Sequence, residues 1–337
     1  MRQASTMNEP LITVLGAGSI GCYLGGRLQQ GGARVRLIGR ARYAEAVAAH
    51  GLTLSRTGED PVTLREVAFA TDPAALEGSA IVALCTKSGD TADSAALIAQ
   101  HAPDAWVVSF QNGVSNLPVL RAALGRVSGA VVPFNVTSPE PGRFHQGTDG
   151  ALVIGPDAPD ALLEPLRAAA QPVRVDANIE GHLWAKLLVN LNNALNALSG
   201  GPLRDGLLQR DYRRVLITMI EEGLAVARAD GAEVATFNGR APEQLVALMA
   251  KPDWLYRFLM DRIAKIDRTA RSSMLDDLEL GRGSELDHLQ GEIVRRGDAL
   301  GVPTPVNRAV MAATQTAFDA GASPRLSGTD MRARFLG

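Results

Sequence analysis

The chain has 337 residues, of which 46% are hydrophobic, and a formal net charge of −2 at pH 7. This length predicts about two domains, each large enough to bury a sizeable core. The near-neutral charge argues against binding to nucleic acid and against a polybasic patch that would bind the protein to a membrane. We therefore expect small-molecule partners, and a second copy of the chain in a homodimer is the other partner that these numbers leave open.

The N-terminal ten residues lack the charged and then apolar layout of a signal peptide. No apolar run reaches the roughly 18 residues that a membrane-spanning helix needs. Cys22 and Cys85 each sit in an apolar segment, which favours two buried free thiols over a disulfide or a metal site. The five histidines are scattered without metal-ligand spacing, so no metal site is predicted. Together these features predict a cytoplasmic protein.

The first half of the chain alternates short apolar runs with amphipathic segments, such as Asp90–Gln100 and Asn116–Ala123, that are typical of helices. The predicted strands are Leu11–Leu15, Arg34–Ile38, Ala80–Cys85, Trp106–Phe110, Ala130–Phe134 and Ala151–Ile154. Such alternation predicts a Rossmann-type, doubly wound, mostly parallel sheet with helices on its faces. Leu52–Ser55 and Val62–Phe69 are separated by a turn and are expected to form a local hairpin.

The second half shows long helical patterns and no convincing strand from about residue 179 onward. The predicted helices are Glu180–Leu198, Leu207–Ala229, Pro242–Ile266, Asp276–Leu300 and Pro305–Ala320. We therefore predict an α/β chain with a dinucleotide-binding Rossmann domain over residues 1–178 and an all-α, substrate-binding domain over residues 179–337. The joint between two such domains is where ligand clefts tend to form.

A glycine motif of the form G-x-G-x-x-G follows the first predicted strand, opens a helix and returns to a second strand within ~30 residues. The first glycine permits the tight turn, the second lets the backbone approach a pyrophosphate, and the third lets the helix pack against the strand. The phosphates would sit on free N–H groups at the helix N-terminus. An ordinary glycine-rich turn is the alternative. The predicted cofactor-binding residues of this loop are Gly16, Ala17, Gly18, Ser19, Ile20 and Gly21.

The end of the second predicted strand bears on which dinucleotide is bound. NAD sites usually carry an acidic residue there, which accepts a hydrogen bond from the ribose 2′-OH. This chain has Arg40 instead, with Arg42 close behind it. A guanidinium suits a 2′-phosphate because it forms bidentate, charge-assisted hydrogen bonds. We therefore predict NADPH as the cofactor, with Arg40 as the main contact and Arg42 as a helper; a solvated loop arginine is the alternative.

One predicted helix carries a cation and a row of amides among leucines. Lys186, Asn190 and Asn193 share one face, because residues four and seven apart lie nearly above one another on a helix. Such a face suits a pocket that holds a carboxylate and a keto oxygen. The alternatives are a snorkelling lysine and asparagines that cap or bridge helices. Ser272-Ser273 and the later Glu285, taken alone, indicate a helix cap and a solvated charge.

Taken together, these motifs resemble the 2-dehydropantoate 2-reductase (ketopantoate reductase) family, and the likeness spreads over nearly the whole chain. The segment from Pro141 to His145 is similar to the family's last Rossmann strands. The lysine–asparagine helix and the serine–glutamate spacing are more specific than the glycine motif. The residues that carry the resemblance are Gly16–Gly21, Lys87, Gln111-Asn112-Gly113, Pro141-Gly142 with His145, Lys186 with Asn190, and Ser272-Ser273-Met274 with Glu285.

The resemblance implies NADPH-dependent reduction of a 2-keto acid, ketopantoate, to pantoate, as in pantothenate synthesis. It implies that Lys186 is the general acid that protonates the keto oxygen, and that Glu285 bonds to the bound ligands, the cofactor included, and orders the site. The other implied contacts are Asn112 beside the nicotinamide ribose and the substrate, Lys87 beside the cofactor, and Asn190 and Ser273 on the substrate's hydroxyl and carboxylate.

Two features depart from the family's pattern. The family commonly has a second asparagine eight residues after the lysine, where this chain has Ala194, so Asn193 is a candidate substitute for substrate binding. The region Gly231–Ile266 is also longer than a minimal member needs. These departures leave open a dehydrogenase of another small 2-hydroxy acid or an opine. A non-catalytic, NADP-sensing protein that kept the fold is a further alternative.

The working pKa of the lysine depends on two opposing effects. A free lysine has a pKa of ~10.4, which is high for proton transfer near neutral pH. Partial burial would lower the pKa of Lys186, whereas a nearby Glu285 would raise it. The sequence alone does not rank the two.

Overall fold

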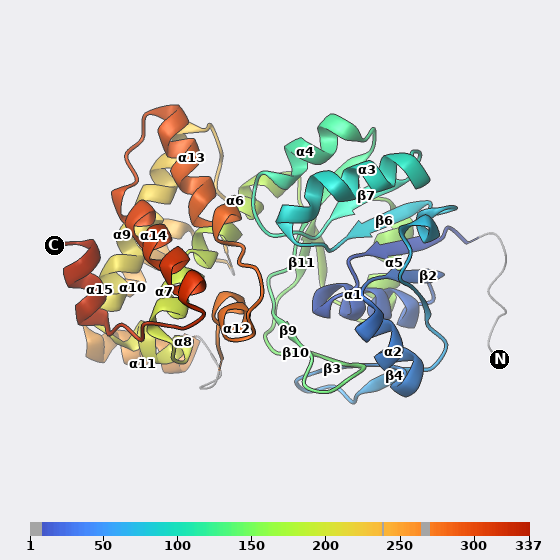
Figure 1. Cartoon of the computed structure of the whole chain (residues 1–337), viewed down its shortest axis with the longest axis horizontal. Helices are drawn as coiled ribbons and strands as arrows, with labels where there is room; N and C mark the ends of the chain where they lie inside the picture. Colours follow the sequence, from blue (N-terminus) through green and yellow to red (C-terminus); the bar gives the residue numbers. More distant parts are fainter. Residues whose placement is uncertain (1–8, 238, 264–269) are drawn as a thin grey trace. The chain divides into compact units, whose positions relative to one another are not determined.

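A computed structural model describes residues 9–237, 239–263 and 270–337. The chain divides into two compact units, Met1–Ile179 and Glu180–Gly337. The first unit combines sheets and helices, and the second is built of helices, as the ribbon in Figure 1 shows.

The first unit contains an eight-stranded sheet with the order β12-β11-β8-β7-β6-β1-β2-β5. All neighbouring strands in it are parallel except β8 and β11. The strands are β1 (Ile12–Leu15), β2 (Val35–Ile38), β5 (Ala68–Ala70), β6 (Ile81–Leu84), β7 (Trp106–Ser109), β8 (Val127–Val131), β11 (Leu152–Ile154) and β12 (Val173–Val175).

Helices cover both faces of this sheet, which explains why its central strands are continuous apolar runs. In β6, Ile81 and Ala83 belong to one buried cluster, whereas Val82 and Leu84 belong to another, because successive side chains point to opposite faces. The helices of this unit are α1 (Ser19–Gln30), α2 (Ala41–His50), α3 (Thr91–His101), α4 (Asn116–Ala123) and α5 (Asp160–Ala168), with 3-10 turns η1 (Pro73–Leu76) and η2 (Ser88–Asp90).

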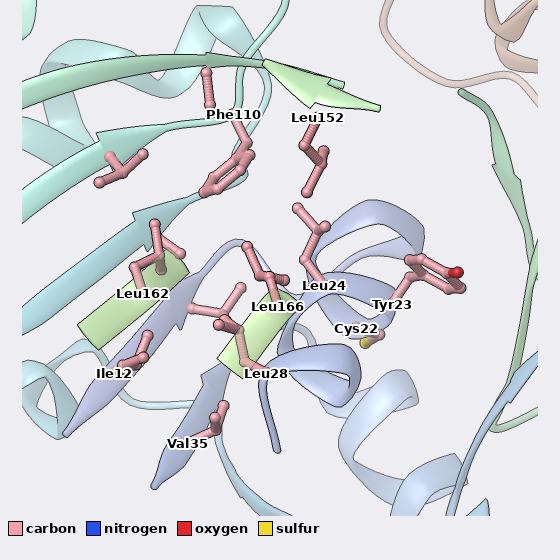
Figure 2. Packing of buried hydrophobic residues seen from close by; sticks show 14 of the residues in the cluster. Ile12, Cys22, Tyr23, Leu24, Leu28, Val35, Phe110, Leu152, Leu162 and Leu166 are labelled. Carbon is pink, nitrogen blue, oxygen red and sulfur yellow. The ribbon is translucent and has the colours of Figure 1, made fainter. Parts of the chain in front are cut away.

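One face of the sheet is packed by α1 and α5. Leu24 and Leu28 of α1 lie beside Leu162 and Leu166 of α5 in the cluster that Figure 2 shows. The opposite face is covered by residues of α3 and α4, among them Ile98 and Leu120. The helix that follows the glycine motif is therefore fixed on the sheet by an apolar core.

A second, four-stranded sheet has the order β4-β3-β10-β9. The predicted hairpin is confirmed for its first part, since β3 (Leu52–Arg56) pairs antiparallel with β4 (Val62–Leu64). The rest of the predicted Val62–Phe69 strand was wrong, because β5 separates from β4 and pairs with β2 of the large sheet.

The expectation that the segment from Pro141 to His145 belongs to the last strands of the Rossmann sheet was also wrong. β10 (Arg143–Gln146) does not join the Rossmann sheet but pairs parallel with β3 and antiparallel with β9 (Val136–Thr137). Gly142 begins this pairing, since its carbonyl accepts a hydrogen bond from the Thr53 N–H at 2.8 Å. A short strand pattern does not reveal which partner the strand will take.

Two further strand predictions need correction. The predicted Ala130–Phe134 strand begins three residues earlier, as β8, and ends at Val131 before Pro133, whose nitrogen has no hydrogen to donate to a ladder. The edge strand β12 was not predicted at all. Its residues are half-buried or exposed, so it lacks the apolar run that marks a central strand.

The second unit confirms the predicted all-helical character, and with it the fold class. Among its described residues the one strand-like feature is an isolated bridge between Phe237 and Arg240. No helix in the described parts of the chain is long and apolar enough to cross a bilayer. The helices are α6 (Ile179–Asn190), α7 (Asn192–Ser199), α8 (Leu203–Leu208), α9 (Arg210–Ala229), α10 (Pro242–Met249), α11 (Asp253–Ile263), α12 (Ser273–Glu279), α13 (Gln290–Leu300), α14 (Pro305–Ala320) and α15 (Gly328–Phe335), with the 3-10 turn η3 (Leu286–His288).

Several predicted helices prove to be pairs. Glu180–Leu198 breaks at Leu191 into α6 and α7, and Leu207–Ala229 comprises the end of α8 followed by α9. Pro305–Ala320 was predicted with the bounds of α14.

Two other helix predictions differ from the structure. Asp276–Leu300 was wrong as one helix, because α12 ends at Glu279 and Gly281 then adopts a left-handed backbone with φ +61°. Pro242–Ile266 divides at Pro252 into α10 and α11, and its last three residues lie outside the described part of the chain.

Candidate active site

The glycine loop connects β1 to α1 at the carboxyl end of β1. Gly16 has φ +96°, and a Cβ there would lie 2.5 Å from the Thr86 nitrogen, so this position accepts only glycine. A Cβ on Gly21 would lie 2.4 Å from the Gly16 oxygen, which shows how closely α1 approaches the turn. Gly18 is different, because a Cβ added there would meet nothing within 4 Å. The loop thus has one open side, at Gly18.

The start of α1 offers N–H groups to an anion. The N–H groups of Gly16 and Ala17 both donate to the Ile38 carbonyl, and Cys22 makes the first helical bond, to Gly18, at 2.8 Å. The N–H groups of Ser19 to Gly21 precede that bond and have no intrahelical acceptor. No acidic residue lies in the first turn. The positive end of the helix, free N–H groups and open space at Gly18 therefore fit a pyrophosphate.

This loop lies where the strand order of the sheet reverses. The chain runs from β1 to β2 on one side and later returns to β6 on the other side of β1. Open α/β sheets bind ligands outside the carboxyl ends of their strands at such a switch point. Lys87 follows β6 and Asn112 follows β7, so both lie at the same edge of the sheet as the glycine loop.

A network of hydrogen bonds joins the loops that carry Lys87 and Asn112. The Gln111 Nε2 donates to the Lys87 carbonyl at 3.3 Å and to Thr86 Oγ1 at 3.2 Å. The Ser88 hydroxyl donates to the Asn112 carbonyl at 2.7 Å. Both predicted cofactor residues are half-buried, and their backbones are held by these bonds.

Arg40 lies two residues after the end of β2, the other neighbour of β1, and is the N-cap residue of α2. It is exposed, and no side chain in the described parts of the chain pairs with its guanidinium. Arg42 is also exposed, but its guanidinium carbon lies 4.8 Å from the centre of the Tyr43 ring. Arg40 is therefore the more available of the two for an external anion.

In the second unit, Lys186 and Asn190 occupy one face of α6. Lys186 is half-buried, and burial lowers the pKa of its ammonium from 10.5 to about 8. The pKa of Lys186 is therefore lowered overall, so the effect of burial exceeds any upward effect of a nearby carboxylate. Asn190 is only 8% exposed, and its side-chain amide has no hydrogen-bond partner among the described residues.

The other asparagines divide into two kinds. Asn192 and Asn196 bridge elements, since Asn192 accepts from the Tyr212 hydroxyl at 2.7 Å and Asn196 donates to the Gly201 carbonyl at 2.8 Å. The side chain of Asn193 is half-buried and makes no such bond within the described chain. Ala194 is fully buried, so the position eight residues after the lysine belongs to the core here.

The two serines also separate. Ser272 is the N-cap of α12, with its hydroxyl accepting from the Leu275 N–H at 3.2 Å and donating to the Asn193 carbonyl at 3.3 Å. The capping alternative is thus confirmed for Ser272. Ser273, the first residue of α12, is exposed. Because the neighbouring Ser272 donates to the Asn193 carbonyl, the two candidate substrate contacts Ser273 and Asn193 lie in one region.

Glu285 lies in the segment between α12 and α13, immediately before η3, and is half-buried. Among the described residues, no cluster of three metal-ligating side chains occurs. Sequence reasoning missed Phe237, whose ring centre lies 5.6 Å from the Lys186 Nζ. No spacing or motif marks that residue.

Comparisons with known proteins decide the family. The PanE/ApbA ketopantoate reductase family matches residues 12–159, and the C-terminal part of the same family matches residues 178–317. A crystal structure of a PanE/ApbA family ketopantoate reductase from Ralstonia eutropha JMP134 is 35% identical, with a TM-score of 0.79, and covers 92% of this chain and 99% of that one. The chain belongs to the ketopantoate reductase family.

Other proteins resemble this ketopantoate reductase family member at lower identity. The 2-dehydropantoate 2-reductase of Pyrococcus horikoshii is 28% identical over 307 residues, which are 88% of this chain and 93% of that protein. A D-mandelate dehydrogenase solved with NADH has a TM-score of 0.77 at 18% identity over 92% of this chain and 99% of that one, so it shares the fold. The predicted resemblance is confirmed, and the chain is an NAD(P)-dependent reductase of this family.

Proposed function

We propose that this protein reduces 2-dehydropantoate to pantoate with NADPH. The observation that carries the proposal is the face of α6 on which a half-buried ammonium of lowered pKa stands one turn before a buried amide without a partner among the described residues. Relatives named 2-dehydropantoate 2-reductase, over most of their length, support the choice of substrate. In this proposal the first unit binds the dinucleotide and the second binds the substrate.

Lys186 is the proposed general acid. A bound nicotinamide supplies hydride to the carbonyl carbon of the substrate. Negative charge then develops on the carbonyl oxygen, where the Lys186 ammonium stabilises it and donates its proton. A pKa of about 8 suits this role, because the lysine is mostly protonated at neutral pH yet gives up its proton far more readily than a free lysine.

The substrate contacts that we propose are Asn190, Asn193 and Ser273. The Asn190 side chain has no hydrogen-bond partner among the described residues, and an amide can both donate to and accept from a hydroxyl, so it is available to a ligand. The Asn193 amide takes the place of the family's second asparagine, since Ala194 is enclosed in the core. Glu285 is proposed to bond to the bound ligands and to order the site.

The proposed cofactor contacts are the glycine loop for the pyrophosphate, Lys87 and Asn112 at the nicotinamide end, and Arg40 for the 2′-phosphate. An exposed guanidinium without an internal partner loses no ion pair when it binds a phosphate. Arg40 is therefore the basis for choosing NADPH over NADH.

The test is NADPH consumption by purified protein with a panel of 2-keto acids. We expect turnover of 2-dehydropantoate and a kcat/KM lower by about 10²-fold or more for 3-methyl-2-oxobutanoate, which lacks the hydroxymethyl group. Lys186→Ala should abolish reduction, and Asn190→Ala should remove most of the discrimination between the two substrates. Equal turnover of the two 2-keto acids, or a preference for benzoylformate, would contradict the proposed substrate. The protein would then be a reductase that forms another 2-hydroxy acid.

The homodimer expected from the sequence remains a prediction. A relative from Staphylococcus aureus is described as dimeric. Sedimentation equilibrium would establish whether this chain also forms the homodimer that we propose.

A further inference from the structure

The Lys186 ammonium is held in an unusual way for a half-buried cation. Its Nζ lies 5.6 Å from the centre of the Phe237 ring. Among the described residues, no carboxylate forms an ion pair with it and no oxygen accepts a hydrogen bond from it. The ring is therefore the one partner of the cation within the described chain.

The fold brings Phe237 to this place through two backbone connections. The chain leaves α9 at Ala229, and the Ala235 N–H donates to the Gly181 carbonyl of α6 at 3.1 Å. Phe237 then forms a closed bridge with Arg240, in which the Phe237 N–H donates at 2.8 Å and the Arg240 N–H donates at 3.1 Å. The segment is thus fastened both to α6 and to itself.

The ends of this segment are also joined. Arg228, near the end of α9, forms an ion pair with Glu243 in the first turn of α10. The ion pair and the backbone hydrogen bond to α6 therefore hold Phe237 beside that helix.

An aromatic face differs from a carboxylate as a partner for a cation. The face attracts the ammonium through the ring's quadrupole but carries no net charge. A carboxylate at the same distance would stabilise the charged lysine strongly and would oppose loss of its proton. A ring therefore fixes the direction of the ammonium while leaving it able to donate.

We propose that Phe237 is a positioning residue for Lys186, whose ring face holds the ammonium in the direction from which it protonates the substrate. The role depends on the proposed function of Lys186 as the general acid. It adds to that function a residue that touches the acid rather than the substrate.

The first experiment replaces Phe237 by fluorinated phenylalanines, introduced at this position alone. Each added fluorine weakens the attraction of the ring for a cation while keeping its size nearly unchanged. We expect kcat for 2-keto acid reduction to fall stepwise from phenylalanine through monofluoro- and difluoro- to trifluorophenylalanine, about tenfold in all, with the KM for NADPH unchanged. A flat series would overturn the proposal.

Natural variants give a second, independent measurement. Phe237→Tyr keeps the ring and should retain kcat within about twofold, whereas Phe237→Leu keeps an apolar side chain without a ring face and should lose about tenfold. Phe258→Leu, the same substitution on α11, is the matched control and should leave kcat unchanged. Equal kcat values for Phe237→Tyr and Phe237→Leu would contradict a role for the ring.

Failure of this proposal is distinguishable from failure of the proposed function. If Lys186→Ala retains full reductase activity, the general acid is assigned wrongly. If Lys186→Ala is inactive but the fluorine series is flat, only the role of Phe237 is wrong.

Discussion

The side-chain oxygen of Asn196 accepts a hydrogen bond from the backbone N–H of Ser272 at 2.9 Å. This bond joins α7 to the first turn of α12 across 76 positions of sequence, and both ends are buried. It therefore fixes Ser273, one residue further on, relative to the helix that carries Asn193. Asn196 is fully buried and uses its amide for these internal hydrogen bonds, so it supports the two proposed substrate contacts from within the core.

Replacement of Asn196 tests this support. Asn196→Ala would leave the buried Ser272 N–H and the half-buried Gly201 carbonyl without their side-chain partner, at a cost of about 2–3 kcal/mol in the free energy of unfolding. Asn193→Ala is the matched control, because its amide has no partner within the described chain, and it should change that free energy by less than about 0.5 kcal/mol. Urea unfolding measures both, and similar losses for the two variants would contradict the division of the asparagines.

The lowered pKa of Lys186 predicts the pH dependence of the reaction. If Lys186 is the general acid, as proposed, reduction needs its ammonium, so kcat/KM should be constant below pH 7 and should fall as the pH rises through about 8, the pKa of this group. The reverse oxidation of pantoate needs the neutral amine and should rise through the same pH. Rates with NADPH and with NADP measured from pH 6 to 10 check this, and a descending limb near pH 10 would show that burial does not act on the lysine.

The lowered pKa of Lys186 also predicts how the free energy of unfolding depends on pH. The effect is opposite to that of a lysine in a salt bridge, whose pKa is raised by folding. The pKa of Lys186 is about 8 in the folded chain and 10.5 when the side chain is surrounded by water, so between these values the unfolded chain binds more protons. Stability should therefore gain from this group as the pH rises from 8 to 10.5. Lys186→Met should unfold at a higher urea concentration than the parent at pH 7, although the proposed role of Lys186 predicts that this variant has no reductase activity. A lower midpoint would mean that the ammonium stabilises the fold.

The glycine loop offers a pair of substitutions with different expected outcomes. Gly21→Ala would push a Cβ to 2.4 Å from the Gly16 oxygen, and we expect a loss of about 1–3 kcal/mol in stability. Gly18→Ala meets open space and should leave stability within about 0.5 kcal/mol, while weakening NADPH binding about tenfold or more. Thermal unfolding and fluorescence titration with NADPH separate the two effects. Normal NADPH affinity in Gly18→Ala would place the pyrophosphate elsewhere.

Cofactor choice is tested at Arg40. Arg40→Ala should raise the KM for NADPH by about 10- to 100-fold, the loss expected for charge-assisted hydrogen bonds to a phosphate, and should change the KM for NADH by less than about threefold. Arg42→Ala should have a smaller effect, because that guanidinium already lies over the Tyr43 ring. Equal effects of Arg40→Ala on the two cofactors would remove its role in reading the 2′-phosphate.

Local signals in the sequence were enough for the parts of the fold that local physics determines. The strand β1, the glycine turn and α1 follow one another within a short stretch. Their order alone therefore predicts the loop and the need for glycine at Gly16 and Gly21, where a Cβ would clash. The buried faces of the central strands were predictable because continuous apolar runs occur where helices cover both sides of a sheet.

Other parts depended on partners that are distant in the sequence. The break at Leu191 has no glycine or proline to announce it, and the partner of β10 lies some ninety residues earlier. Gly281 and Gly283, by contrast, were visible breakers within the predicted Asp276–Leu300 helix. The contact of Phe237 with Lys186 could not be predicted, because it depends on a hydrogen bond from Ala235 back to α6.

The parallel pairing of β3 with β10 has a consequence for the order of assembly. Arg143–Gln146 must reach Thr53–Arg56 after the whole centre of the large sheet has been synthesised, and closing so long a loop is slow. A chain cut short before residue 143 would leave one side of β3 unpaired and the Tyr23 hydroxyl without its bond to Gln146. An open strand edge attracts other chains, so we expect such a fragment to aggregate rather than to persist as a separate dinucleotide-binding module.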